Sequence, residues 1–163
     1  MIKVVRADIT TLHIDAIVNA AKETQQGGGG VDGAIHRGAG PELLAACRKL
    51  GGCPVGEARI TPGFKLPAAW VIHTVGPVWQ GGHANEAKLL ASCYHRCADL
   101  ALKQAVNTIA FPGISTGAYG YPKQPAATIA VSAMQAYEDK FEQIIFCCFS
   151  EADKKIYEKI LGL

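Results

Sequence analysis

Two glycine-rich stretches have the residue types best suited to chemistry on a ligand. The first has four consecutive glycines at residues 27–30 and continues through Asp32 into a predicted helix. The second covers residues 112–122 and carries hydroxyl groups at Ser115 and Thr116. Backbone N–H groups free of side chains, placed before a helix N-terminus, form a donor cluster for an anion. Two such clusters suit a diphosphate. Flexible turns are the alternative, but a turn rarely needs four successive glycines.

Two common phosphate-binding motifs do not fit the glycine stretches. Gly28, Gly30 and Gly33 match the dinucleotide pattern G-x-G-x-x-G, but the pattern does not follow a predicted strand directly. No suitable acidic residue follows about 20 residues later, so the pattern does not favour a Rossmann site. GxxxxGK[ST] is absent from both stretches, which argues against a kinase or an ATPase.

Alternating strand and helix patterns surround these stretches. Short apolar runs bounded by turn residues predict strands at Ile2–Val5, Ala16–Val18, Ala58–Ile60, Val71–Val75, Thr108–Phe111 and Ile144–Phe149. Three- and four-residue apolar spacing predicts helices at Pro41–Leu50, Glu86–Ala105, Pro125–Tyr137 and Glu151–Leu161. This alternation predicts an α/β fold in three α/β/α layers. Ligands of such folds bind beyond the carboxyl ends of the strands, where both glycine stretches are expected.

Length and charge limit the class of protein. The 163 residues approximate one domain length, so a single domain over residues 1–163 is expected. Lysine and arginine exceed aspartate and glutamate by only two, and no basic block occurs. Strong nucleic-acid binding is therefore not expected, and an anionic ligand needs a built site. No apolar run approaches the length of a membrane span, and the N-terminus is too polar for a signal peptide.

The six cysteines have no CxxC spacing and predict buried thiols of a reducing compartment. The expected location is the cytoplasm, without membrane partners. A zinc site at Cys93, His95 and Cys97 would need a second ligand pair that is not visible, so neither a metal nor a cofactor is predicted.

Ordered motifs along nearly the whole chain resemble the macrodomain family. They are residues 8–10, 15–21, 27–36, 73–77 and 114–120. The sequence is most similar to the MacroD-type branch, which includes bacterial O-acetyl-ADP-ribose deacetylases. The resemblance implies a macrodomain fold with a central mixed sheet. It also implies an ADP-ribose pocket and hydrolysis of an ester at the distal ribose, on acidic protein side chains or on acetate.

The resemblance also implies a set of site residues. The implied ligand-binding residues are Asp8, Ile9, Gly27, Gly28, Gly29, Gly30, Val31, Ser115, Thr116, Gly117, Ala118, Tyr119 and Phe149. Asp8 matches the carboxylate that accepts a hydrogen bond from the adenine amine, although a loop or capping aspartate is the alternative. Phe149 matches the position of an aromatic that stacks on adenine, with core packing as the alternative. Tyr119 and Tyr121 are expected either at the ribose end or on the surface.

Three residues are implied for catalysis: Asp32, Asn19 and Lys22. Asp32 is expected to orient or deprotonate the attacking water, although a first-turn aspartate without chemistry is the alternative. His36 shares a helix face with Asp32 and is interpreted as a buried, hydrogen-bonded histidine rather than the base. Lys22 stands where similar hydrolases have asparagine, and it offers only donors and a charge.

Lys22 leaves two functions open. If its ammonium pairs with Asp32 or the phosphate, water activation weakens, and the chain becomes an ADP-ribose reader with little or no turnover. If the ammonium extends outward, the site loses only one orienting hydrogen bond. The retained Asp32 favours the hydrolase, and ADP-ribose, ADP-ribosylated protein and O-acetyl-ADP-ribose are the expected partners.

Overall fold

A computed structural model describes residues 1–22 and 29–163. Gly27 and Gly28, two of the expected ligand-binding residues, lie outside this part of the chain. The strands are β1 (Ile2–Arg6), β2 (Ala16–Ala20), β3 (Ala58–Pro62), β4 (Trp70–Thr74), β5 (Thr108–Phe111) and β6 (Gln143–Cys148). The helices are α1 (Gly30–Ala39), α2 (Pro41–Lys49), α3 (Glu86–Lys103), α4 (Lys123–Gln135) and α5 (Glu151–Leu161), with a short 3-10 helix η1 (Ile9–Thr11).

The strands form one six-stranded sheet in the order β1-β6-β5-β2-β4-β3. β3 runs antiparallel to β4, whereas the other neighbouring pairs are parallel. The predicted α/β fold with a mixed sheet is therefore confirmed. Several boundaries differ from prediction by one or two residues. The last strand ends at Cys148, so Phe149 follows it, and α4 begins two residues before Pro125. Pro125 still lies in the first turn, where its missing N–H breaks no helical hydrogen bond.

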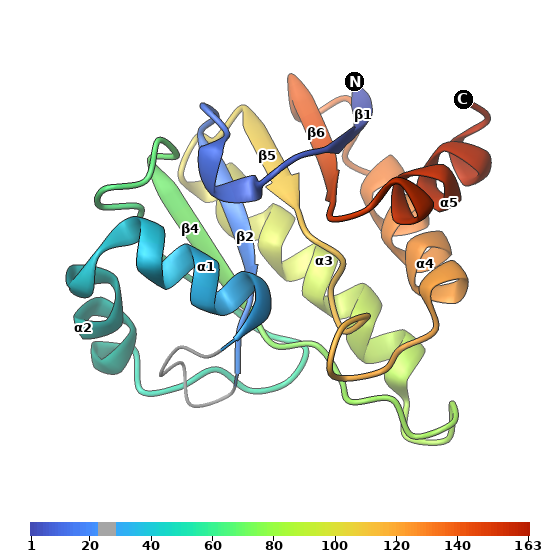
Figure 1. Ribbon diagram of the computed structural model, residues 1–163, viewed down its shortest axis with the longest axis horizontal. Helices are drawn as coiled ribbons and strands as arrows, with labels where there is room; N and C mark the ends of the chain where they lie inside the picture. Colours follow the sequence, from blue (N-terminus) through green and yellow to red (C-terminus); the bar gives the residue numbers. More distant parts are fainter. Residues whose placement is uncertain (23–28) are drawn as a thin grey trace.

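Helices cover both faces of the sheet, as the layer prediction requires (Figure 1). One face packs against α1 and α2 through buried residues that include Ile17, Ile35 and Leu43. The other face packs against α3, α4 and α5 through residues such as Val18 and Leu90. No helix among the described residues is long and apolar enough to span a membrane.

Strand register places polar side chains inside the layer beneath α1 and α2. Asn19 on β2 is the direct partner of His73 on β4. Because side chains alternate along a strand, Asn19 shares its sheet face with Ile17, which packs against α1 and α2. Both Asn19 and His73 are completely buried. The fold therefore buries a polar pair between the sheet and these helices.

Candidate functional site

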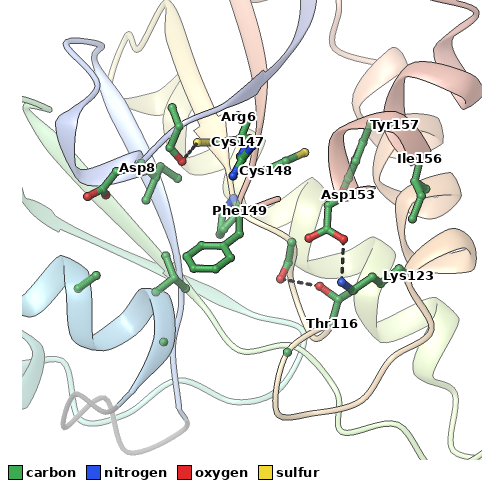
Figure 2. Close-up of a pocket in the computed structure, with 18 of the residues that line it drawn as sticks. Arg6, Asp8, Thr116, Lys123, Cys147, Cys148, Phe149, Asp153, Ile156 and Tyr157 are labelled. Carbon is green, nitrogen blue, oxygen red and sulfur yellow. Dashed lines mark hydrogen bonds and ion pairs between the residues drawn. The ribbon is translucent and has the colours of Figure 1, made fainter. Parts of the chain in front are cut away.

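A cavity of about 870 Å³ opens at the edge where the parallel strands end (Figure 2). Its wall comes from residues 6–9 after β1, residues 147–149 at the end of β6, and the loop after β5. Residues of α1 and α5 and the start of α4 complete it. Of the residues expected to bind ligand, Asp8, Ile9, Gly30, Val31, Thr116, Gly117 and Phe149 line this cavity. Segments far apart in the sequence thus meet at one site.

Asp8 lines the cavity and also caps η1. Its Oδ1 accepts hydrogen bonds from the Thr10 hydroxyl at 2.7 Å and the Thr10 backbone N–H at 3.0 Å. Both bonds lower the pKa of Asp8, and the bond from the Thr10 hydroxyl has the larger effect. The carboxylate is therefore charged at neutral pH. Among the described residues, no donor binds Oδ2, which leaves that oxygen for a ligand. The capping alternative is present in the structure and does not conflict with a ligand role.

Phe149 lies at the mouth of the cavity with 93% of its surface exposed. The core-packing alternative for this ring is therefore wrong, because the strand ends one residue earlier and turns the side chain outward. In Figure 2 the ring lies between Asp8 and the ion pair of Lys123 and Asp153. Lys123 Nζ lies 2.7 Å from Asp153 Oδ1 in this pair. An exposed aromatic face at a cavity mouth can stack on a planar ligand.

Two buried cysteines form part of the wall behind Phe149. Burial raises the pKa of Cys147 to about 11 and that of Cys148 to about 12, so both remain neutral thiols. Within residues 1–22 and 29–163, no group of three or more His, Cys, Asp or Glu side chains could hold a metal ion.

The N-terminus of α1 opens into the cavity. Gly29 is its N-cap residue, and no side chain among the described residues caps the helix there. Gly30 has a φ of +60°, the left-handed backbone expected in the glycine run. The first backbone N–H groups of a helix lack intrahelical partners. The N–H groups of Gly30 and Val31 are therefore donors at a positive dipole end.

The loop after β5 faces α1 across the cavity. Ser115 has a φ of +66° and is buried, and its Oγ has no hydrogen-bond partner among the described residues. Its close packing requires Gly76, where an added Cβ would lie 2.1 Å from Ser115 Oγ. Thr116, Gly117 and Ala118 are partly or fully exposed on the outer turn of the loop. The positive φ of Ser115 is a strained backbone conformation for a non-glycine residue, and such conformations concentrate at functional sites.

Asp32 lies in the first turn of α1 and is not among the residues that line the cavity. Its Oδ1 accepts a hydrogen bond of 2.8 Å from Asn19 Nδ2, and His36 Nε2 lies 3.5 Å from the same oxygen. The residue is only 5% exposed. Oδ2 is buried and has no partner in the described part of the chain. The predicted proximity of Asp32 and His36 on one helix face is confirmed.

Lys22 is exposed and, within the described residues, forms no ion pair. Asp32 bonds to Asn19 instead. The ion pair between Lys22 and Asp32 that the sequence left open is therefore not formed in the described part of the chain.

The loop after β5 is supported by contacts that the sequence did not predict. Tyr121 is buried against Trp79 with ring centroids 4.6 Å apart, so it is not a surface aromatic. The Trp79 backbone N–H donates to the Tyr119 carbonyl at 2.8 Å. The adjoining segment is held by buried Glu86, which accepts hydrogen bonds from three backbone N–H groups at residues 80, 82 and 84. Glu86 therefore braces the second loop from behind.

Glu86 makes stability depend on pH in the acid range. Burial alone raises its pKa, but the backbone donors outweigh burial and lower the pKa from 4.5 to about 2. A lowered carboxyl pKa stabilises the fold above pH 4.5, and this contribution disappears as pH falls towards 2. We expect Glu86→Gln to lower the urea midpoint at pH 7, with the difference from wild type shrinking between pH 4.5 and 2. Exposed Glu138→Gln is the control. A difference independent of pH would contradict this role.

Comparison with known proteins identifies the family. Residues 18–130 match the Macro domain family. The chain is 59% identical to a macro domain-containing protein of Chlorobaculum tepidum, across 99% of this chain and 96% of that protein. It is 52% identical to an O-acetyl-ADP-ribose deacetylase of Citrobacter rodentium, across 98% of this chain and 94% of that protein.

A solved structure supports the same assignment. The Trypanosoma brucei macrodomain in complex with ADP-ribose has a TM-score of 0.93 and 45% identity, covering 99% of this chain and 69% of that one. The agreement of family match, sequence identity and fold shows that this chain belongs to the Macro domain family.

Proposed function

We propose that this macrodomain binds ADP-ribose and hydrolyses ADP-ribose esters at the distal ribose, releasing free ADP-ribose. The observation that carries the proposal is the cavity itself, which has an acidic and aromatic end and a second end bordered by backbone donors. The names of the deacetylase relative and of the ADP-ribose complex support the same ligand.

The adenine is proposed to bind at the end formed by Asp8, Ile9 and Phe149. Oδ2 of Asp8 accepts a hydrogen bond from the exocyclic amine, and the Phe149 ring stacks on the base. A charged acceptor at this end discriminates against a base that presents a carbonyl in place of the amine. Arg37 also lines the cavity, and its side chain is exposed.

The diphosphate is proposed to lie between the two backbone donor clusters. The N-terminus of α1 supplies Gly30 and Val31 on one side. The loop containing Ser115, Thr116 and Gly117 supplies the other. Because these are mainly backbone donors, they hold phosphate charge without a cluster of lysines or arginines. This fits a chain of small net charge.

Hydrolysis is proposed to use Asp32 as the group that orients or deprotonates water. Oδ1 is occupied by Asn19, so Oδ2 is the available acceptor. The water oxygen forms a bond to the ester carbonyl carbon as one water proton passes to Asp32, and the bond from that carbon to the ribose oxygen breaks. The ribose oxygen takes the proton from Asp32 and becomes a hydroxyl, and the released acid ionises to a carboxylate. A positioned base of this kind contributes about 10² to 10⁴ in rate.

Two measurements on one preparation test the proposal. Release of ADP-ribose from a glutamate-modified protein reports hydrolysis, and calorimetry with free ADP-ribose reports binding. We expect both. Binding without release would make the chain a reader, and absence of binding in a folded protein would overturn the proposal.

Lys22→Asn tests the departure from the pattern of similar hydrolases. Because the Lys22 side chain is exposed and Asp32 bonds to Asn19, we expect a change of less than about threefold in single-turnover hydrolysis, typical of the loss of an exposed charge. The two proteins are compared on the same modified substrate. An inactive wild type with a strongly active Lys22→Asn variant would instead identify a reader on a hydrolase scaffold.

A further inference from the structure

Four buried polar side chains form a continuous chain of contacts across three strands to α1. Thr61 on β3 lies 3.0 Å from His73 Nε2, and His73 Nδ1 lies 3.2 Å from Asn19 Nδ2. Asn19 Nδ2 in turn donates to Asp32 Oδ1 at 2.8 Å. We call Thr61, His73, Asn19 and Asp32 the polar chain. None of them is more than 5% exposed.

The chemistry of these groups fixes the direction of each hydrogen bond. A carboxylate only accepts, so the Asn19 amide must present its nitrogen to Asp32. The same nitrogen faces His73 Nδ1, which must then accept the second amide hydrogen. The imidazole proton therefore resides on Nε2 and is donated to the Thr61 hydroxyl. Only one tautomer of His73 and one orientation of Asn19 satisfy every contact.

His73 is suited to this role because it stays neutral. Burial, assisted by the nearby His36, lowers the pKa of His73 to about 3. Cys47 Sγ lies 3.7 Å from His73 Nε2, and burial, assisted by Asp32, raises the pKa of Cys47 to about 11. A neutral thiol next to Nε2 places no competing charge there.

We propose that His73 is a positioning residue for Asp32: its Nε2–H tautomer, fixed by Thr61, orients the Asn19 amide, which holds Asp32 Oδ1 and leaves Oδ2 for water. The inference rests on the proposed function only in assigning chemistry to Asp32. Rotation of the Asn19 amide by 180° would place its oxygen against both the carboxylate and Nδ1. The amide oxygen could not form a hydrogen bond with either of these acceptors, so Asp32 would be forced to another position.

Two substitutions at His73 separate positioning from packing. Asparagine can place an acceptor near the position of Nδ1, whereas glutamine can reach Thr61 but lacks that acceptor. We expect His73→Asn to keep hydrolysis within about threefold of wild type. We expect His73→Gln to lose about tenfold or more, the factor that corresponds to one misdirected hydrogen bond. ADP-ribose affinity should change by less than about threefold in both. Asparagine leaves the larger cavity, so a purely structural role predicts the opposite order, and that order would overturn the proposal.

Substitutions at Thr61 give an independent test. Thr61→Val removes the acceptor for Nε2–H at nearly constant volume, whereas Thr61→Ser keeps the hydroxyl. We expect hydrolysis to fall about threefold to tenfold in Thr61→Val and to be retained in Thr61→Ser. Equal rates in the two variants would contradict the role of Thr61.

Nuclear magnetic resonance keeps this inference separate from the proposed function. Long-range ¹H–¹⁵N spectra of wild type should show a protonated Nε2 and an unprotonated Nδ1 at His73. The Asn19 side-chain amide should give a single sharp pair of signals that broadens or shifts in His73→Gln but not in His73→Asn. These signals need no turnover. A protonated Nδ1, or an Asn19 amide unaffected by His73→Gln, would overturn the positioning role even in an active enzyme. Conversely, an inactive wild type with the expected signals would overturn only the proposed function.

Discussion

Asp32→Ala is expected to slow single-turnover ester hydrolysis by about 100-fold or more while ADP-ribose affinity stays equal or improves. The rate falls because the variant lacks the acceptor that activates water. Affinity does not fall because a carboxylate near the ligand diphosphate repels it. Rapid-quench measurement of ADP-ribose release, alongside calorimetry, checks the divergence of the two quantities.

Asp32→Asn is the matched variant for this prediction. Its amide oxygen can still accept the 2.8 Å hydrogen bond from Asn19, so the local fold is preserved while the charge is lost. We expect a rate loss similar to that of Asp32→Ala. Equal losses of rate and affinity would indicate a collapsed site, and an unchanged rate would remove Asp32 from catalysis.

Asp8→Ala is expected to weaken ADP-ribose binding about 10- to 150-fold. A hydrogen bond to a charged group contributes about 1.5 to 3 kcal/mol, which corresponds to this range. Preference for ADP-ribose over the inosine analogue should shrink as well, because the amine loses its acceptor. Calorimetry with both ligands measures each effect.

Thr10→Val separates ligand recognition from capping of η1. It removes the hydroxyl bond to Asp8 Oδ1 but keeps the backbone N–H bond and the carboxylate. We expect ADP-ribose affinity to change by less than about threefold. If Thr10→Val weakened binding as much as Asp8→Ala, Asp8 would act by shaping the loop, and the direct contact with adenine would be rejected.

Local patterns in the sequence predicted much of the fold. Apolar runs bounded by turn residues located every strand core, and Pro41 and Pro125 lie in first helical turns as predicted. The environment of Phe149 was harder to predict, because an aromatic residue after an apolar run fits the last position of a strand and the first position of a loop equally well. Whether it is buried depends on a boundary of one residue, which local pattern does not resolve.

The polar chain and the Glu86 brace could not be predicted in the same way. Asn19 meets His73 only because β2 and β4 pair in one register, and a shift of one residue would turn one of them to the opposite face. Glu86 stands at the start of a predicted helix, and its backbone donors come from a loop without a repeating pattern. Both features depend on distant contacts rather than on local residue types.

Pairing of β1 with β6 has a consequence for synthesis of the chain. Ile2 lies opposite Ile144, and the cavity joins Asp8 from the beginning of the chain to Phe149 near its end (Figures 1 and 2). A growing polypeptide therefore carries both loops proposed to bind phosphate before it has the ring proposed to stack on the base. Under the proposed function, the nucleotide stabilises the fold only after β6 has left the ribosome and inserted between β1 and β5.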